Sequence, residues 1–373
     1  MMMKIAKWLA ALILFLIAWN HPAISQQHIQ VEPGPEDFAL DLISPNAPQL
    51  IAICKKRSGR KKKRTMHYVA VDLDNNLPRR IEVEGQTPLS DPYLMTGAKI
   101  FQRDGKFILI GNIEHRQSGQ HEIVEYELKK ETLAFEKRWK DPTQRLGQTN
   151  NLLPDQKGGL YVSTFFDKPN WMGGRLFLGF FTKKKEGRIL YAKDAEAAFQ
   201  SEGRLEATNS FTIWQDTLFV TASMENNLFA YPILSDGLGD RIDLPVPIKG
   251  GDNVYRDGAY LLTTGAYTKL GFLWNNTFKK ASIKSYVYEI KLGEGGPKLM
   301  RIIEIDKKQK MGAVSVAYRQ GDQYWVGQLY KDTLLTFREN DLVESGTATI
   351  KLPKGIVPKG QRKVRVPKFV FKQ

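Results

Sequence analysis

The stretch Gly250-Gly251-Asp252-Asn253-Val254-Tyr255 decides the fold, because the pattern that it begins recurs along the chain. A Gly-bearing turn, Arg256-Asp257-Gly258, follows it, and then an apolar run from Ala259 to Leu262. This order is typical of two short strands joined by a turn: a polar pair, a few extended residues, a turn and then a hydrophobic run. We call the polar residues that begin such a unit its head.

Six apolar runs repeat this pattern. They are Leu50-Ile51-Ala52-Ile53, Phe107-Ile108-Leu109-Ile110, Leu160-Tyr161-Val162, Leu218-Phe219-Val220, Tyr260-Leu261-Leu262 and Tyr324-Trp325-Val326. Units of roughly 40 to 60 residues built from short strands and turns are typical of propeller blades. The sequence therefore predicts an all-β, six-bladed β-propeller with a central channel over residues 26–340. The alternative is a β-sandwich with irregular hairpins, which leaves the polar heads unexplained.

Residues 1–25 have the pattern of a signal peptide. Lys4 and Lys7 form a basic start, and the apolar segment from Trp8 to Trp19 is short for a membrane span. Ala23-Ile24-Ser25 supplies small residues at the expected cleavage position. We expect a secreted or periplasmic protein that begins at Gln26; the alternative is an uncleaved N-terminal anchor.

The chain is basic, with a net charge of +15. Most Lys and Arg residues are dispersed, but they cluster in a predicted hairpin at residues 55–64 and in a C-terminal extension, residues 341–373. These segments are suited to peripheral contact with anionic surfaces. A solvated hairpin tip is the alternative for residues 55–64, and a strapped or frayed tail is the alternative for residues 341–373. No nucleic-acid-binding motif accompanies either cluster, so we expect no nucleic-acid partner.

The heads carry oxygen donors. In chain order they supply Glu36, Thr96, Asn150, Asn209, Asp252, Asn253 and Ser315. The innermost strands of a propeller run along its channel, so these side chains can converge there. Carboxylate and amide oxygens without Cys or a His cluster suit Ca²⁺ rather than Zn²⁺. The alternative is that each Asn and Asp only stabilises a turn.

Five segments also resemble known motifs, in the same order. They are Gly34-Pro35-Glu36-Asp37-Phe38, Gln148-Thr149-Asn150-Asn151, Thr208-Asn209-Ser210-Phe211, Asp252-Asn253-Val254 and Ser315-Val316-Ala317. They are similar to segments of the paraoxonase/arylesterase family of calcium-dependent six-bladed propellers, which is related to gluconolactonases and strictosidine synthase-like proteins. The resemblance covers roughly residues 36–337. It implies that a catalytic calcium is held by Glu36, Asn150, Asn209, Asp252 and Asn253.

The chain departs from this family at two places. Thr96 stands before Gly97 where the family has its proposed catalytic histidine, and threonine is a poor general base; the second family histidine falls near His115. The family's structural calcium uses an Asp pair. Here Asp37 is kept and Asn151 stands at the partner position, so the loss of one charge should weaken this second metal site or abolish it.

The resemblance implies a calcium-dependent hydrolase of lactones or aryl esters, in which Ca²⁺ polarises the carbonyl group. His115 and Thr96 are its candidate catalytic residues, although Thr96 is not expected to act as a base. The alternative is a non-catalytic, calcium-stabilised propeller that binds a ligand or a protein. The sequence does not indicate which ester or lactone is bound, nor the oligomeric state.

Overall fold

The structure is a computed structural model, and it describes residues 26–31, 35–41, 49–55, 66–84, 93–115, 120–129, 132–155, 157–166, 187–265, 284–329, 331–352, 354–358, 360 and 362–372. The predicted signal peptide and residues 56–64 of the basic hairpin lie outside the described residues. Within the described ranges, no helix is long and apolar enough to cross a membrane.

Strands make up nearly all of the regular structure. In the described part of the chain, the helices are two short 3-10 turns, η2 (Lys307–Gln309) and η3 (Glu339–Asp341). Local turn chemistry explains the many hairpins. Asp104 and Gly105, for example, have φ angles of 51° and 76°, and positive φ at both central residues is the conformation of a type I′ turn between antiparallel strands. The all-β prediction is confirmed.

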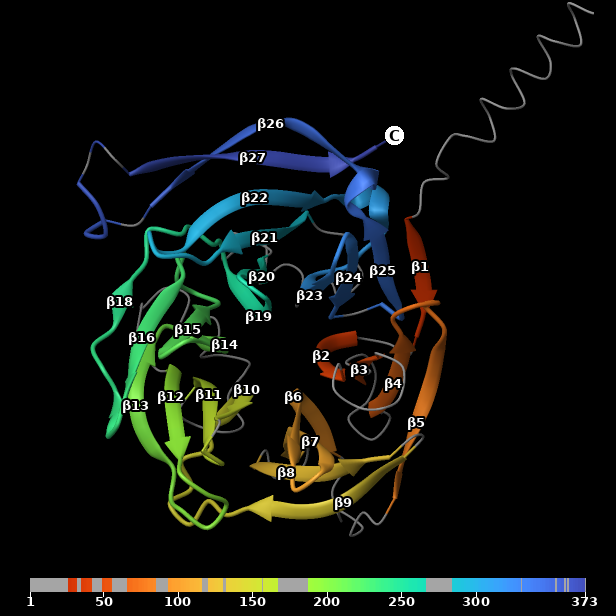
Figure 1. The fold of residues 1–373 in the computed structure, drawn as a ribbon, viewed down its shortest axis with the longest axis vertical. Coiled ribbons are helices and arrows are strands. Elements are labelled where there is room, and N and C mark those ends of the chain that lie inside the picture. The colour runs from red at the N-terminus through yellow and green to blue at the C-terminus, as the bar shows by residue number, and fades with distance from the viewer. Residues whose placement is uncertain are drawn as a thin grey trace, which may run out of the picture.

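The largest sheet joins eight strands in the order β2-β3-β4-β5-β9-β8-β7-β6. They are β2 (Pro35–Asp41), β3 (Gln49–Lys55), β4 (Met66–Asp72), β5 (Pro78–Glu84), β6 (Tyr93–Arg103), β7 (Lys106–His115), β8 (His121–Leu128) and β9 (Thr132–Trp139). All neighbours are antiparallel except β5 and β9, which are parallel. The sheet thus consists of two antiparallel meanders that meet at their outer strands (Figure 1).

The next two sheets are single meanders, ordered β10-β11-β12-β13 and β14-β15-β16-β17, with β18 also paired to β16. Their strands are β10 (Gln148–Pro154), β11 (Leu160–Phe166), β12 (Gly187–Ala192), β13 (Gln200–Leu205), β14 (Thr208–Trp214), β15 (Thr217–Ala222), β16 (Phe229–Leu234), β17 (Gly237–Leu238) and β18 (Ile242–Asp243). Strand β11 is buried on both faces, which explains why its sequence reads as a continuous apolar run rather than an alternating one.

The last two sheets involve the chain ends. Their orders are β19-β20-β21-β22-β27-β26 and β1-β25-β24-β23. The strands are β1 (Gln27–Gln30), β19 (Gly251–Asp257), β20 (Tyr260–Gly265), β21 (Ser285–Lys291), β22 (Lys298–Ile305), β23 (Val314–Gln320), β24 (Gln323–Gln328), β25 (Thr333–Arg338), β26 (Leu342–Lys351) and β27 (Lys363–Phe371). Strand β1 pairs antiparallel with β25, so the first described strand completes the sheet formed by β23 to β25.

The sheets surround a common centre, with the first strand of each meander innermost (Figure 1). These inner strands are β2, β6, β10, β14, β19 and β23, and each contacts the next around the ring, with β23 contacting β2. The six apolar runs found in the sequence form β3, β7, β11, β15, β20 and β24, the strands paired with the inner ones.

The hydrophobic core lies between neighbouring meanders. One cluster packs Ile53 and Tyr68 of the first meander against Met95 and Val124 of the second. Another joins Tyr161 of β11 to side chains of β14 and β16. Because the removal of apolar surface from water drives such packing, each sheet holds the next in place. The inner strands, and the polar heads that they carry, are therefore fixed by the sheets behind them.

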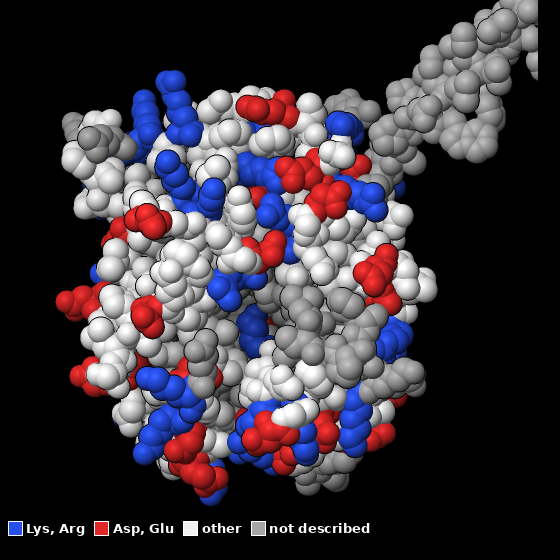
Figure 2. Space-filling model, in the orientation of Figure 1, with Lys and Arg blue, Asp and Glu red and all other residues white. Residues whose placement is uncertain are grey.

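The C-terminal extension adds the hairpin β26–β27 to the outer edge of β22, through a parallel pairing of β27 with β22. Ile350 and Val366 face the core beneath it, whereas Lys351, Lys363 and Arg365 are exposed. Figure 2 shows Lys and Arg side chains projecting at the upper edge of the molecule, where Figure 1 places this hairpin.

Candidate functional site

Each of the innermost hairpins has a break in its strand register. In the described part of the chain, these breaks fall between Pro35 and Asp37, Met95 and Gly97, Thr149 and Leu152, Thr208 and Phe211, Gly251 and Val254, and Val314 and Val316. They enclose Glu36, Thr96, Asn150, Asn151, Asn209, Asp252, Asn253 and Ser315. A break of this kind releases residues from the ladder and re-aims their side chains, and bulges are common beside active sites. The residues predicted from the sequence as heads are thus those that the backbone sets apart.

Side chains from three inner strands meet at these breaks. The Asn151 Nδ2 of β10 donates to the Asn253 Oδ1 of β19 at 2.9 Å. The Ser315 Oγ of β23 donates to the Asp252 Oδ2 at 3.0 Å and lies 3.5 Å from the Asn253 Nδ2. Figure 2 shows the same face hollowed near its middle, where Figure 1 places the inner strands.

Two buried amide oxygens at the breaks lack hydrogen-bond donors. The Asn209 Nδ2 donates to the Ser223 Oγ at 2.8 Å, and the Asn151 Nδ2 is used as described above. The Oδ1 atoms of both residues are buried without a hydrogen-bond partner among the described residues. An unsatisfied buried acceptor costs about 1–3 kcal/mol, so both oxygens are suited to a cation.

The donor set fits a hard cation. Within the described ranges, no group of three or more His, Cys, Asp or Glu side chains is placed to hold a metal. The oxygens available are the amides of Asn150, Asn151 and Asn209 and the carboxylate of Asp252, while the side chain of Glu36 lies outside the described part. A set dominated by neutral and anionic oxygens suits Ca²⁺, which accepts six to eight oxygens in loose geometry.

Buried hydroxyl groups fix the backbone of three breaks. The Thr221 Oγ1 of β15 donates to the Asp252 carbonyl at 2.7 Å, and the Thr264 Oγ1 of β20 donates to the Ser315 carbonyl at 2.7 Å. The Ser163 Oγ of β11 donates to the Asn209 carbonyl in the same manner. In each case, the strand behind one break holds the next break along the ring. Each hydroxyl residue closely follows an apolar run, which is the sequence signal that could have identified it.

Thr96 belongs to a polar cluster with Asn112, Thr149 and His121. The Asn112 Nδ2 contacts the Thr96 Oγ1, and the Thr149 Oγ1 contacts the Asn112 Oδ1. The His121 Nδ1 lies 2.7 Å from the Thr149 Oγ1. Gly97 packs beside this cluster so tightly that a Cβ there would lie 2.4 Å from the Asn150 carbonyl oxygen. The cluster therefore adjoins the oxygen donors of β10.

His115 has a different environment. Its Nε2 lies 3.0 Å from the Glu122 Oε1, which is on the neighbouring strand β8. His121, which sequence reasoning did not select, is the histidine that joins Thr96. The antiparallel register of β7 and β8 explains why His121 rather than His115 belongs to the cluster. His121 lies opposite Glu114, one residue before His115.

Asp37 of β2 is completely buried and is already hydrogen bonded. Its Oδ1 accepts from the Phe38 amide at 2.8 Å and from the Tyr255 hydroxyl at 2.6 Å, and its Oδ2 accepts from the Ala98 amide at 3.1 Å. The described contact of the Asn151 amide is with Asn253 instead.

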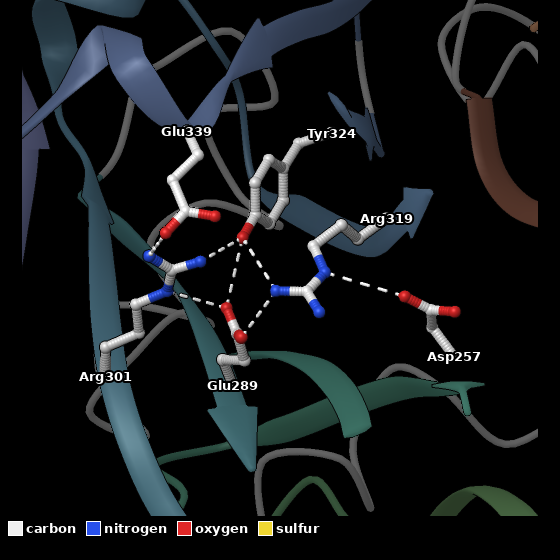
Figure 3. Close-up of polar contacts among 6 residues, drawn as sticks. All are labelled: Asp257, Glu289, Arg301, Arg319, Tyr324 and Glu339. Carbon is white, nitrogen blue, oxygen red and sulfur yellow. Dashed lines mark hydrogen bonds and ion pairs between the residues drawn. The ribbon is translucent and has the colours of Figure 1, made fainter. Parts of the chain in front are cut away.

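A network of buried charged groups lies between the sheets that contain β19–β22 and β23–β25 (Figure 3). The Glu289 carboxylate accepts from the Arg301 Nε at 2.7 Å and from the Arg319 Nη1 at 2.6 Å. The Tyr324 hydroxyl, Glu339 and Asp257 complete the network. Because the charged groups pair with one another, we assign the network to stability rather than to ligand binding.

Neither a protein-family model nor a curated protein sequence matches the chain. Solved structures do match. A luciferin-regenerating enzyme aligns with a TM-score of 0.53 and 11% identity, covering 84% of this chain and 95% of that one. The chain has a propeller-type fold. A gluconolactonase from Xanthomonas campestris also aligns, with a TM-score of 0.46 and 10% identity over 84% of this chain and 97% of that one. The alignment with the luciferin-regenerating enzyme agrees with the propeller fold that the sequence resemblance implied.

Proposed function

We propose that the chain is a six-bladed propeller that binds Ca²⁺ in its central channel and hydrolyses lactones or aryl esters. The observation that carries the proposal is the placement of the polar heads in the six register breaks, with the Oδ1 atoms of Asn151 and Asn209 buried and without donors. Supporting it are the motif order in the sequence and the propeller-type fold. The assignment of the substrate class rests on the motifs.

The residues of the breaks would hold the cation. Glu36, Asn150, Asn209, Asp252 and Asn253 are the ligands expected from the motifs, and Asn151 adds an oxygen that the structure leaves without a donor. A bound Ca²⁺ supplies Lewis-acid polarisation of a carbonyl group. Ser315 orients the Asp252 carboxylate through its hydrogen bond to Oδ2.

We assign proton transfer to His121, supported by its place in the same polar cluster as Thr96. Thr149 holds the His121 ring through Nδ1, and Asn112 links Thr149 to the Thr96 hydroxyl. Thr96 itself donates to the Thr149 carbonyl at 3.2 Å, so its hydroxyl positions this cluster rather than accepting a proton. His115, the residue suggested by the sequence, is the competing assignment.

The activity test is hydrolysis of a panel of lactones and aryl esters by purified protein, with calcium or with EGTA. We expect slow turnover that requires calcium and is fastest for phenyl esters and strained lactones, because these substrates need the least help from proton transfer. If the protein binds calcium but hydrolyses no compound of the panel, the enzymatic proposal is wrong. That result would favour the alternative of a non-catalytic, calcium-stabilised propeller that binds a ligand or a protein. The observation that supports this alternative is Thr96, which stands where the family has its histidine.

A pair of histidine variants tests the assignment of the base. His121→Ala should lower calcium-dependent hydrolysis about 10²-fold, the lower end of what general-base catalysis contributes. The matched control, His115→Ala, should change the rate by less than about threefold, because His115 pairs with Glu122. The opposite order of effects, measured as kcat with the melting temperature checked for both variants, would return the role to His115.

A further inference from the structure

A buried carboxylate and a buried ammonium group contact the same buried tyrosine of an inner strand. Asp37 comes from β2 and Lys99 from β6, and each contacts Tyr255 of β19. Asp37 is completely buried, and so is the Lys99 Nζ. The three residues belong to three different meanders, so their contacts join inner strands that are not paired with one another.

Tyr255 contacts both charged groups. Its hydroxyl donates to the Asp37 Oδ1 at 2.6 Å, and the Lys99 Nζ lies 3.8 Å from the centre of its ring. The face of an aromatic ring attracts a cation, and the electrostatic attraction between Lys99 and Asp37 acts in the same direction. The Lys99 Nζ has no hydrogen-bond partner among the described residues, so its attraction to Asp37 and Tyr255 compensates its charge.

A buried carboxylate that has lost its hydration requires a nearby positive charge or strong donors. The Asp37 oxygens receive donors from Phe38, Ala98 and Tyr255, all of them neutral. Burial lowers the pKa of Lys99 to about 8, and attraction to Asp37 opposes that change. The ammonium group is therefore still mainly charged at neutral pH.

We infer that the Lys99 ammonium group supplies the positive charge beside Asp37, in place of the second metal ion that the resemblance implied for Asp37 and Asn151. A divalent ion bound by Asp37 would have to share a buried region with a positive charge, and like charges repel strongly where water is excluded. Asn151, the second predicted ligand, contributes its Nδ2 to Asn253 and its Oδ1 to the oxygen set of the register breaks. Asp37 and Asn151 therefore do not fit a second metal ion in this chain.

The first measurement is metal stoichiometry. Protein dialysed against calcium should retain no more than one tightly bound Ca²⁺ per chain, measured by elemental analysis and by calorimetric titration with calcium alone. Two tightly bound ions per wild-type chain would overturn the inference. This readout does not depend on hydrolysis, so an inactive protein leaves it intact.

The second measurement is a double-mutant cycle followed by melting temperature. Lys99→Met leaves the Asp37 charge uncompensated, and Asp37→Asn leaves the Lys99 charge uncompensated, so each should lower the melting temperature by on the order of 5 °C. The double variant Asp37→Asn/Lys99→Met removes both charges, so its loss should be smaller than the sum of the two. Lys106→Met, a control at a lysine that is 48% exposed, should shift the melting temperature by about 1 °C or less. Strict additivity in the cycle would show that the two charges do not compensate each other.

If Lys99→Met does not fold, the double variant Asp37→Asn/Lys99→Met alone tests whether Lys99 acts through its charge. Because it contains no uncompensated charge, it should fold and melt close to Asp37→Asn. Failure of the double variant to fold, alongside a folded Asp37→Asn, would show that Lys99 acts through packing rather than charge.

Discussion

Asp252→Ala should abolish the stabilisation that calcium gives and should lower hydrolysis roughly 10³-fold. Asp252 is the only described carboxylate in the register breaks, and its loss removes a charged ligand from a set made mostly of neutral amides. Loss of one preorganised electrostatic group typically lowers turnover 10²–10³-fold, and loss of the cation adds to this. Melting curves with calcium and with EGTA, together with kcat on a phenyl ester, measure both effects.

The matched control is Asp257→Ala, at the other end of the same strand. Asp257 is 35% exposed and lies 3.6 Å from the Arg319 Nε, so its loss should leave the calcium response unchanged and the rate within about threefold. A variant Asp252→Ala that keeps the full calcium-induced shift in melting temperature would show that calcium binds elsewhere.

Glu289→Gln should lower the free energy of unfolding by about 3 kcal/mol. The glutamate side chain is 5% exposed, and it receives hydrogen bonds from Arg301 and Arg319, which are 11% and 12% exposed (Figure 3). Removal of one partner from a buried ion pair costs about 3–5 kcal/mol, because the remaining charges lose their compensation. Glu339 and Asp257 persist on the outer side of the network, which keeps the expected loss at the lower end. Urea denaturation measures this loss of stability as a shift in the midpoint concentration of urea.

The control for this network is Glu136→Gln, which removes an exposed ion pair with Lys106. Its effect should be below about 1 kcal/mol. An equally small effect of Glu289→Gln would mean that Glu339 and Asp257 suffice to compensate both guanidinium groups.

The strands and the heads could be predicted from the sequence because both are local patterns. An apolar run after a turn, such as Leu218-Phe219-Val220, identifies a strand without reference to the rest of the chain. A polar pair such as Asp252-Asn253 at the start of a strand likewise stands out, and the structure shows the reason, which is a break in register.

Other features depend on register and on contacts between distant residues. His121 rather than His115 joins Thr96, because the pairing of β7 with β8 decides which of the two reaches Thr149. Lys99 reads as an ordinary exposed lysine in sequence, and only the approach of β2 and β19 shows that its ammonium group is buried. The Glu289 network joins two sheets in the same way, and no spacing in the sequence predicts it.

The pairing of β1 with β25 sets the order of events during synthesis. Gln27 lies opposite Thr336, so the ring cannot close until more than 300 residues have left the ribosome. Until then, the nascent chain exposes an unpaired strand edge at each end, and such edges invite association between chains. Contacts over this sequence distance also slow folding. Ring closure is therefore a late step, and it joins the first described strand to one made near the end of synthesis.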